Sequence, residues 1–152
     1  MSNLSENSRN PFVILYADDD PEDRMLAEEA FEECKLLNRL IFVEDGDQLV
    51  RYLKHEGEYA DEKEFPTPGL ILLDLNMPKK DGREALKEIK SDPSLKMIPI
   101  VVLTTSSDED DIHDTYELGV SSFITKPVSF DSLVDTIKTL GKYWIELVKL
   151  PK

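Results

Sequence analysis

The chain has little of several features that would place it outside ordinary globular proteins. It holds a single cysteine, Cys34, so no disulfide can form within it. No stretch approaches the roughly 20 consecutive apolar residues of a membrane-spanning helix. The first residues, MSNLSENSRNPF, lack the basic segment and apolar run of a secretory signal. We therefore expect a cytoplasmic protein that has no association with a membrane.

Positive charge is also scarce. Lys and Arg number 18 against 32 Asp and Glu, which gives a formal net charge of −14 over 152 residues. Such a negative field repels the phosphates of nucleic acid and favours cations or basic partners. We therefore expect no binding to nucleic acid, and the length predicts a single domain.

Short apolar runs alternate with amphipathic stretches, which is typical of β-α units around a parallel sheet. The alternation predicts a flavodoxin-like α/β fold: a doubly wound, five-stranded parallel sheet in the order 2-1-3-4-5 with helices on both faces. Residues 1–11 are expected to form a flexible tail, and 56–68 a solvated insertion. The expected strands are 12–17, 39–44, 69–74, 98–104 and 121–125, and the expected helices are 21–34, 46–56, 83–91, 107–118 and 129–149.

Polar residues stand where four of these strands end. Asp18 and Asp19 follow the first strand, Asp74 ends the third, Thr104 ends the fourth and Lys126 follows the fifth. In such sheets, ligands bind at the carboxyl ends of the strands. Clustered carboxylates match a hard divalent cation such as Mg²⁺, while an ammonium and a hydroxyl can donate to phosphoryl oxygens. The pattern predicts a site for a metal ion and a phosphoryl group.

Four motifs carry a resemblance to a known family. They are DD after the first strand, LLDLNMPKKDG around the third, LTTS after the fourth and FITKP at the fifth. Together they resemble the receiver domain of two-component response regulators over about residues 12–140. The DLNMPKKDG loop, the insertion before the third strand and the ending KYWIELVKLP resemble the single-domain regulators that pair with bacterial phytochrome-type histidine kinases.

The resemblance implies a role for each acid. Asp74 would accept a phosphoryl group from a histidine kinase, so that the protein is a signalling protein that catalyses only its own phosphorylation and dephosphorylation. Asp19, Asp74 and the backbone carbonyl of Asn76 would hold Mg²⁺ or Mn²⁺, and Asp18 would reach the ion through water.

It also implies a lysine and a switch. Lys126 would pair with the carboxylate and then with the phosphoryl group, and the Lys126–Pro127 peptide bond would be cis. Thr104 would move toward the phosphoryl group as Phe123 swings inward, which makes a two-state element.

The chain is expected to divide into the tail, a receiver domain over 12–142 and an extension of the last helix over 143–152. Because no room is left for an effector domain, the output should be a contact with another protein. Apolar side chains late in the last helix predict a homodimer or kinase-docking surface. The interface residues expected are Tyr143, Trp144, Ile145 and Val148.

Two other functions fit parts of the pattern. Asp18 and Asp20 have the D-x-D spacing of an aspartate-nucleophile, Mg²⁺-dependent phosphatase of the haloacid dehalogenase type, although Asp20 is also a good helix N-cap. The small size and the loop after Asp74 favour the receiver. An inactive, receiver-like scaffold is the other alternative.

Overall fold

The computed structural model describes residues 12–36, 38–105 and 109–142. Their strands and helices alternate, as expected. The strands are β1 (Ile14–Ala17), β2 (Leu40–Val43), β3 (Leu70–Leu73), β4 (Ile100–Thr104) and β5 (Ser122–Thr125). The helices are α2 (Pro21–Glu33), α3 (Gly46–Leu53), α4 (Gly82–Ser91), α5 (Glu109–Leu118) and α6 (Phe130–Leu140), with one 3₁₀ turn, η1 (Gly57–Tyr59).

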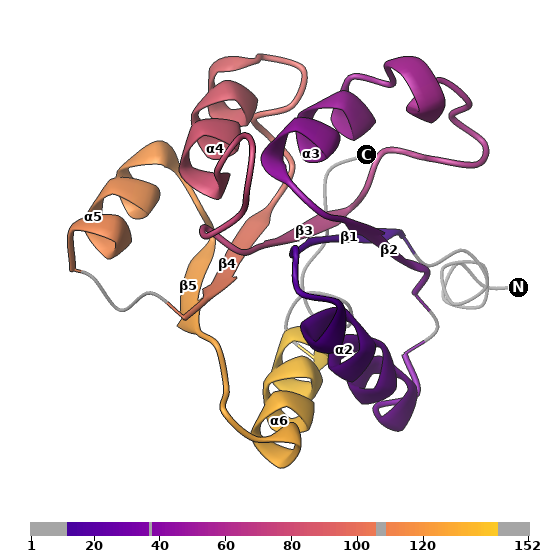
Figure 1. Cartoon of the computed structure of the whole chain (residues 1–152), viewed down its shortest axis with the longest axis vertical. Helices are drawn as coiled ribbons and strands as arrows, with labels where there is room; N and C mark the ends of the chain where they lie inside the picture. Colours follow the sequence, from indigo (N-terminus) through magenta and orange to yellow (C-terminus); the bar gives the residue numbers. More distant parts are fainter. Residues whose placement is uncertain (1–11, 37, 106–108, 143–152) are drawn as a thin grey trace, which may run out of the picture.

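The strands form one parallel sheet in the order β2-β1-β3-β4-β5, which confirms the predicted topology. The helices cover both of its faces (Figure 1). On one face α3, α4 and α5 lie side by side, and on the other α2 packs against α6. The central strands β1 and β3 are buried along their whole length, because each has a helical layer on both sides.

Alternate strand residues feed two separate cores. Leu15, Ala17, Ile71 and Leu73 pack with α3 and α4, whereas Ile14, Tyr16, Leu70 and Leu72 pack with α2 and α6. The alternation follows from the strand geometry, in which successive side chains point to opposite faces. The sheet is therefore packed on both faces, which fixes the positions of the carboxyl ends of its strands.

The insertion before β3 is solvated at its charged residues, as its acidic composition predicted, but its aromatic residues pack on the core. Tyr59 and Phe65 of this segment stack with Tyr52 of α3, with ring centroids 5.1 to 5.8 Å apart. Tyr59 is buried. The aromatic residues thus anchor the insertion to the core beside α3, while its charged side chains remain exposed.

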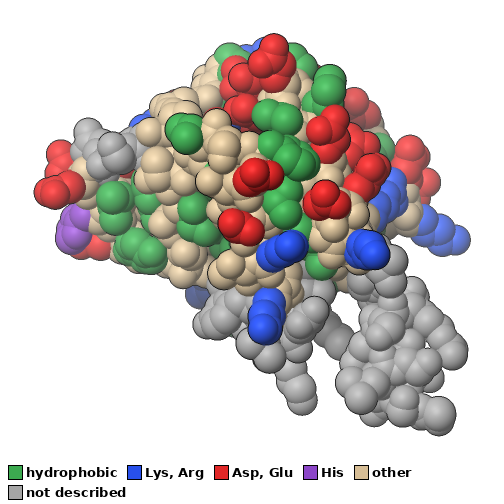
Figure 2. Space-filling view, turned by 90° about the horizontal axis from the view of Figure 1, so that it is seen from below, with side chains coloured by type: hydrophobic (Ala, Val, Ile, Leu, Met, Phe, Trp, Pro, Cys, Tyr) green, Lys and Arg blue, Asp and Glu red, His purple; other side chains and the backbone are tan. Residues whose placement is uncertain are grey.

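Figure 2 shows the face formed over α2 and α6, where hydrophobic side chains lie among acidic ones. Leu26 of α2 is one of them, and 39% of it is exposed. The buried positions of this helix are Ala27, Ala30 and Phe31. Among the described residues, no helix is both long and apolar enough to cross a membrane.

Candidate functional site

The register of the sheet brings two acids to the same level. Ala17, the last residue of β1, pairs with Leu73, the last residue of β3, and the backbone N–H of Asp74 donates to the carbonyl of Ala17 at 3.0 Å. Asp18 and Asp74 therefore leave adjacent parallel strands side by side. Both are buried: Asp18 is 0% exposed and Asp74 is 5% exposed.

Both carboxylate oxygens of Asp74 accept hydrogen bonds. Oδ1 accepts from the Thr104 hydroxyl at 2.9 Å and from the backbone N–H of Asn76 at 3.0 Å, and Oδ2 accepts from the Lys126 ammonium at 3.0 Å. The donors come from β4, from the loop after β3 and from the residue that follows β5. These contacts fix the orientation of the carboxylate at the carboxyl edge of the sheet.

Lys126 is the positive centre of the site. Its Nζ lies 2.7 Å from Asp18 Oδ2, 3.0 Å from Asp74 Oδ2 and 2.6 Å from Asp23 Oδ2. Burial alone lowers the pKa of a lysine, but the close contacts with these three carboxylates outweigh it and raise the pKa of Lys126 above its ordinary value. The side chain is therefore held as an ammonium. Its backbone is fixed as well, because its N–H donates to the carbonyl of Thr104 at 2.7 Å.

Asp18 combines complete burial with an incomplete set of donors. Its Oδ1 accepts from the backbone N–H of Asp20 at 3.0 Å, and its carbonyl accepts from the Arg24 guanidinium at 2.8 Å. Oδ2 lies within ion-pair distance of Lys126 but, among the described residues, accepts no well-aligned hydrogen bond. Burial raises the pKa of Asp18, although the neighbouring ammonium and the Asp20 N–H act in the opposite direction.

These acids fit a divalent cation. One carboxylate oxygen from each of Asp18, Asp19 and Asp74 lies within 4.8 Å of the others. Oxygen ligands with excess negative charge suit Mg²⁺ or Mn²⁺, and the unsatisfied Oδ2 of Asp18 offers a buried acceptor for an ion or its water. Asp19 is exposed, so that an ion could reach the cluster from solvent. Asn76, whose backbone carbonyl was expected to bind the ion, lies beside Asp74. Its backbone N–H donates to Asp74, and its side-chain Nδ2 lies 3.5 Å from the Thr104 hydroxyl.

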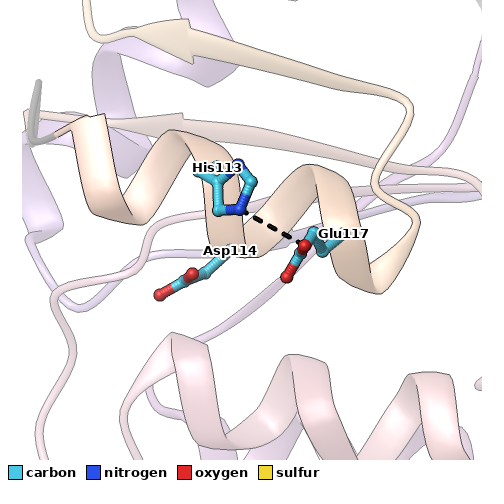
Figure 3. Close-up of side chains that lie close together, drawn as sticks. All are labelled: His113, Asp114 and Glu117. Atoms are coloured by element: carbon cyan, nitrogen blue, oxygen red, sulfur yellow. Dashed lines mark ion pairs between the residues drawn. The ribbon is translucent and has the colours of Figure 1, made fainter.

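A second group of possible metal ligands lies on α5 (Figure 3). His113 and Glu117 face each other one helical turn apart, with Nε2 3.2 Å from the carboxylate, and Asp114 lies next to them. All three side chains are exposed. Such a pair is explained by the i, i+4 spacing of a helix surface, and it contains no buried oxygen comparable to that of Asp18.

The two residues expected to form the switch lie on neighbouring strands. Thr104 is fully buried beside Asp74, whereas Phe123 is half-buried and packs against the core on the α3 and α4 side. The backbone N–H of Phe123 donates to the Tyr116 hydroxyl of α5 at 3.1 Å, which ties β5 to that helix. Their movement stays a prediction.

The structure differs from the sequence-based expectation at Pro127. The described residues contain no cis peptide bond, so the Lys126–Pro127 bond is trans. Trans is the more stable form of an X-Pro bond by about 0.5–1 kcal/mol. The Lys126 ammonium reaches all three carboxylates from this backbone, and a cis bond is therefore not needed to aim it.

The loop after β3 is held in place by a glycine. Gly82 begins α4, and its N–H donates to the carbonyl of Leu75 at 2.9 Å. A Cβ on this residue would lie 2.5 Å from the carbonyl oxygen of Asp74 and 2.7 Å from Cα of Leu75. The start of α4 can approach the Asp74 backbone so closely only because the residue has no side chain.

Sequence reasoning missed two residues of the site. Neither Asp23 nor Arg24, both in the first turn of α2, was predicted to belong to it. Both follow the N-cap Asp20 closely, so that the first turn of α2 faces the carboxyl edge of the sheet. Arg24 also reaches Glu44, the residue after β2, at 3.3 Å. The only sequence signal for these two residues was that they follow the end of the first strand by a few positions.

The D-x-D pair of the phosphatase alternative is not assembled. The Asp20 carboxylate is exposed and accepts from the backbone N–H of Glu22 at 2.9 Å, as an N-cap does. It is not part of the group that could hold an ion with Asp18. The expected interface residues Tyr143, Trp144, Ile145 and Val148 lie outside the described residues.

A parallel sheet in this order, with buried acids, a threonine and a lysine at its carboxyl edge, defines a receiver-type α/β protein. The chain belongs to the response regulator receiver domain family, which matches residues 14–138. It is therefore a signalling protein, as the motifs predicted.

Within this family, the chain is similar to response regulators of phytochromes. The chain is 43% identical to response regulator Rcp1 of Synechocystis sp. over 148 residues, which cover 97% of this chain and 99% of the relative. It superposes on phosphorylated cyanobacterial phytochrome response regulator RcpA with a TM-score of 0.87 and 44% identity, covering 93% of this chain and 99% of the other. For the Mn²⁺-bound form of Rcp1, the TM-score is 0.85 at 44% identity, with 93% and 100% covered.

Proposed function

We propose that this response regulator accepts a phosphoryl group on Asp74 from a phytochrome-type histidine kinase, in a reaction that needs Mg²⁺ or Mn²⁺. The observation that carries the proposal is the convergence of Asp18, Asp19, Thr104 and Lys126 on the Asp74 carboxylate. The similarity to a phosphorylated phytochrome response regulator and to a Mn²⁺-bound one supports the choice of donor and ion.

The reaction is a displacement at phosphorus. An oxygen of Asp74 forms the new O–P bond while the P–N bond of the donor phosphohistidine breaks, and the electron pair leaves with the imidazole nitrogen. A carboxylate is a weak nucleophile, so catalysis rests on alignment and on electrostatic stabilisation of the phosphoryl oxygens. Thr104 and Asn76 orient Asp74 through its Oδ1.

The cation would be held by Asp19, Asp74 and the carbonyl of Asn76, with Asp18 as its inner support. When bound, it neutralises the carboxylates and the phosphoryl oxygens, so that two anions can meet. Lys126 supplies the remaining positive charge and is placed to donate to a phosphoryl oxygen from its position beside Asp74 Oδ2.

The output would be a change of protein-protein contacts. Phosphorylation would turn the Asp74 carboxylate into a neutral acyl group and leave the charge on the phosphoryl oxygens, which would then be the stronger acceptors for the Thr104 hydroxyl, because charge-assisted hydrogen bonds are stronger than neutral ones. Phe123 would move into the space that Thr104 leaves. The homodimer through the last helix, the division of the chain at residues 12 and 142, and the cytoplasmic location remain predictions that accompany this proposal.

Labelling tests the proposal directly. The protein is incubated with Mg²⁺ and acetyl phosphate, and its intact mass is measured against Asp74→Asn. We expect the wild-type chain to gain one phosphoryl group and Asp74→Asn to gain none. Asp20→Asn is the matched control: it removes the same charge nearby, and Asn is also a good N-cap. Labelling that survives in Asp74→Asn, or fails in the wild type, would overturn the proposal.

The donor is tested by transfer. A purified, autophosphorylated phytochrome-type kinase should pass its phosphoryl group to this chain faster than an unrelated histidine kinase does. Equal rates from both would remove the phytochrome-type assignment and leave the role of Asp74 standing.

A further inference from the structure

The Lys126 ammonium competes with the cation for the same carboxylates. Two of its three carboxylate partners, Asp18 and Asp74, belong to the acid group that fits a divalent ion. An ammonium and an ion of charge +2 repel each other and cannot both interact with these two carboxylates at full strength. Binding of the ion therefore requires the ammonium to loosen its hold on at least one of them.

Asp23 is the partner that lies outside this competition. Its Oδ2 is 2.6 Å from Nζ, the shortest of the three contacts, and the carboxylate does not belong to the metal-binding group. It comes from the first turn of α2, 103 residues before Lys126 in the chain. A third of the Asp23 side chain is exposed, against none of Asp18. The ammonium can thus stay paired at Asp23 on the solvent side of the site.

We propose that Asp23 is a positioning residue that holds the Lys126 ammonium to one side while Asp18 and Asp74 take up the divalent cation. The inference rests on the proposed function, since it assumes that the cation binds at these acids. Asp23 acts through Lys126 and touches neither the ion nor the phosphoryl group. Without Asp23, the ammonium pairs more closely with Asp18 and Asp74, and the ion meets a stronger competitor.

Metal affinity is the first readout. Mg²⁺ binding to the unphosphorylated full-length chain is measured by calorimetry for the wild type, Asp23→Asn and Glu22→Gln. We expect Asp23→Asn to raise the Kd about threefold or more. An ammonium that has lost Asp23 pairs more closely with Asp18 and Asp74, and it is then a stronger electrostatic competitor of the ion. Glu22→Gln removes one charge from the same helical turn, but its side chain is exposed, so the Kd should stay close to the wild-type value. An equal Kd for all three proteins would overturn the proposal.

A double-mutant cycle separates positioning from the loss of bare charge. If Asp23 acts through Lys126, Asp23→Asn should leave the Mg²⁺ Kd of a Lys126→Met protein nearly unchanged. The same rise in Kd in both backgrounds would overturn the positioning role, because the Asp23 charge would then be acting on the ion directly. Asp23→Glu, which keeps the charge, should restore most of the affinity and serves as a second variant if Asp23→Asn folds poorly.

The outcomes distinguish the two proposals. A wild-type chain that binds no Mg²⁺ at these acids would overturn the proposed metal site as well as the role of Asp23. A wild-type chain that binds Mg²⁺ and is labelled at Asp74, beside an unaffected Asp23→Asn, would overturn the role of Asp23 alone.

Discussion

Replacing Lys126 by Met should destabilise the protein strongly when no divalent cation is present. Met keeps an unbranched side chain of similar length but removes the ammonium. Asp18 and Asp74, whose side chains are 0% and 7% exposed, then face each other without a positive partner. Removing one member of a buried ion pair typically costs about 3–5 kcal/mol. In a chain of about this size, 1 kcal/mol corresponds to roughly 2–4 °C in Tm, so a fall of about 10 °C is expected.

Thermal unfolding in EDTA measures this effect, and Lys80→Met is the control. Lys80 also makes a 2.7 Å ion pair, with Glu88, but both partners are partly exposed. Such pairs are worth about 0–1 kcal/mol. The Tm of Lys80→Met should therefore remain within a few degrees of the wild-type value.

Added Mg²⁺ should narrow the gap between Lys126→Met and the wild type. A ligand at 100 times its Kd stabilises the native state by about 2.7 kcal/mol, and the variant should bind the ion more tightly because no ammonium competes for Asp18 and Asp74. The reasoning is refuted if Lys126→Met melts with the wild type in EDTA. It is also refuted if the gap in Tm does not respond to Mg²⁺.

Two further variants test the surroundings of the site. In Gly82→Ala the added Cβ would press on the Asp74 carbonyl, so we expect a loss of about 1–3 kcal/mol in urea unfolding and slower acetyl phosphate labelling; an unchanged labelling rate would contradict this. Burial raises the pKa of Asp18 above 3.8, so the native state holds its proton more firmly than the unfolded state, and stability falls as the pH rises through the window above 3.8. Asp18→Asn lacks this titration. In EDTA, its urea midpoint should therefore rise relative to that of the wild type between pH 4 and pH 7. Midpoints that change in parallel with pH would contradict the raised pKa of Asp18.

Periodicity and strand-end chemistry were enough to predict the sheet and most of the site. Buried parallel strands appear in a sequence as continuous apolar runs, and the rule that ligands bind at their carboxyl ends selects Asp18, Asp74, Thr104 and Lys126 without further information. The structure brings these four together. The strands were predicted one or two residues too long, mostly at their amino ends.

Asp23, the insertion and Pro127 could not be predicted in the same way. An acid in the first turn of a helix is fully explained by the helix dipole, so nothing in the sequence marks Asp23 as a partner of a lysine 103 residues away. The burial of Tyr59 and Phe65 depends on their meeting Tyr52, which is a tertiary contact. The cis bond at Pro127 was inferred from family resemblance rather than from local energetics.

The pairing of Ala17 with Leu73 has a consequence for how this protein can vary. The acids that follow these residues are aligned by backbone hydrogen bonds, to which the strand side chains contribute nothing directly. Apolar residues of similar volume can therefore replace one another along β1 and β3 while the distance between Asp18 and Asp74 stays the same. A single-residue deletion in either strand is different in kind, because it moves one carboxylate by about 3.3 Å and turns it toward the opposite layer of helices. Change in length, more than change in composition, is what these two strands cannot accept.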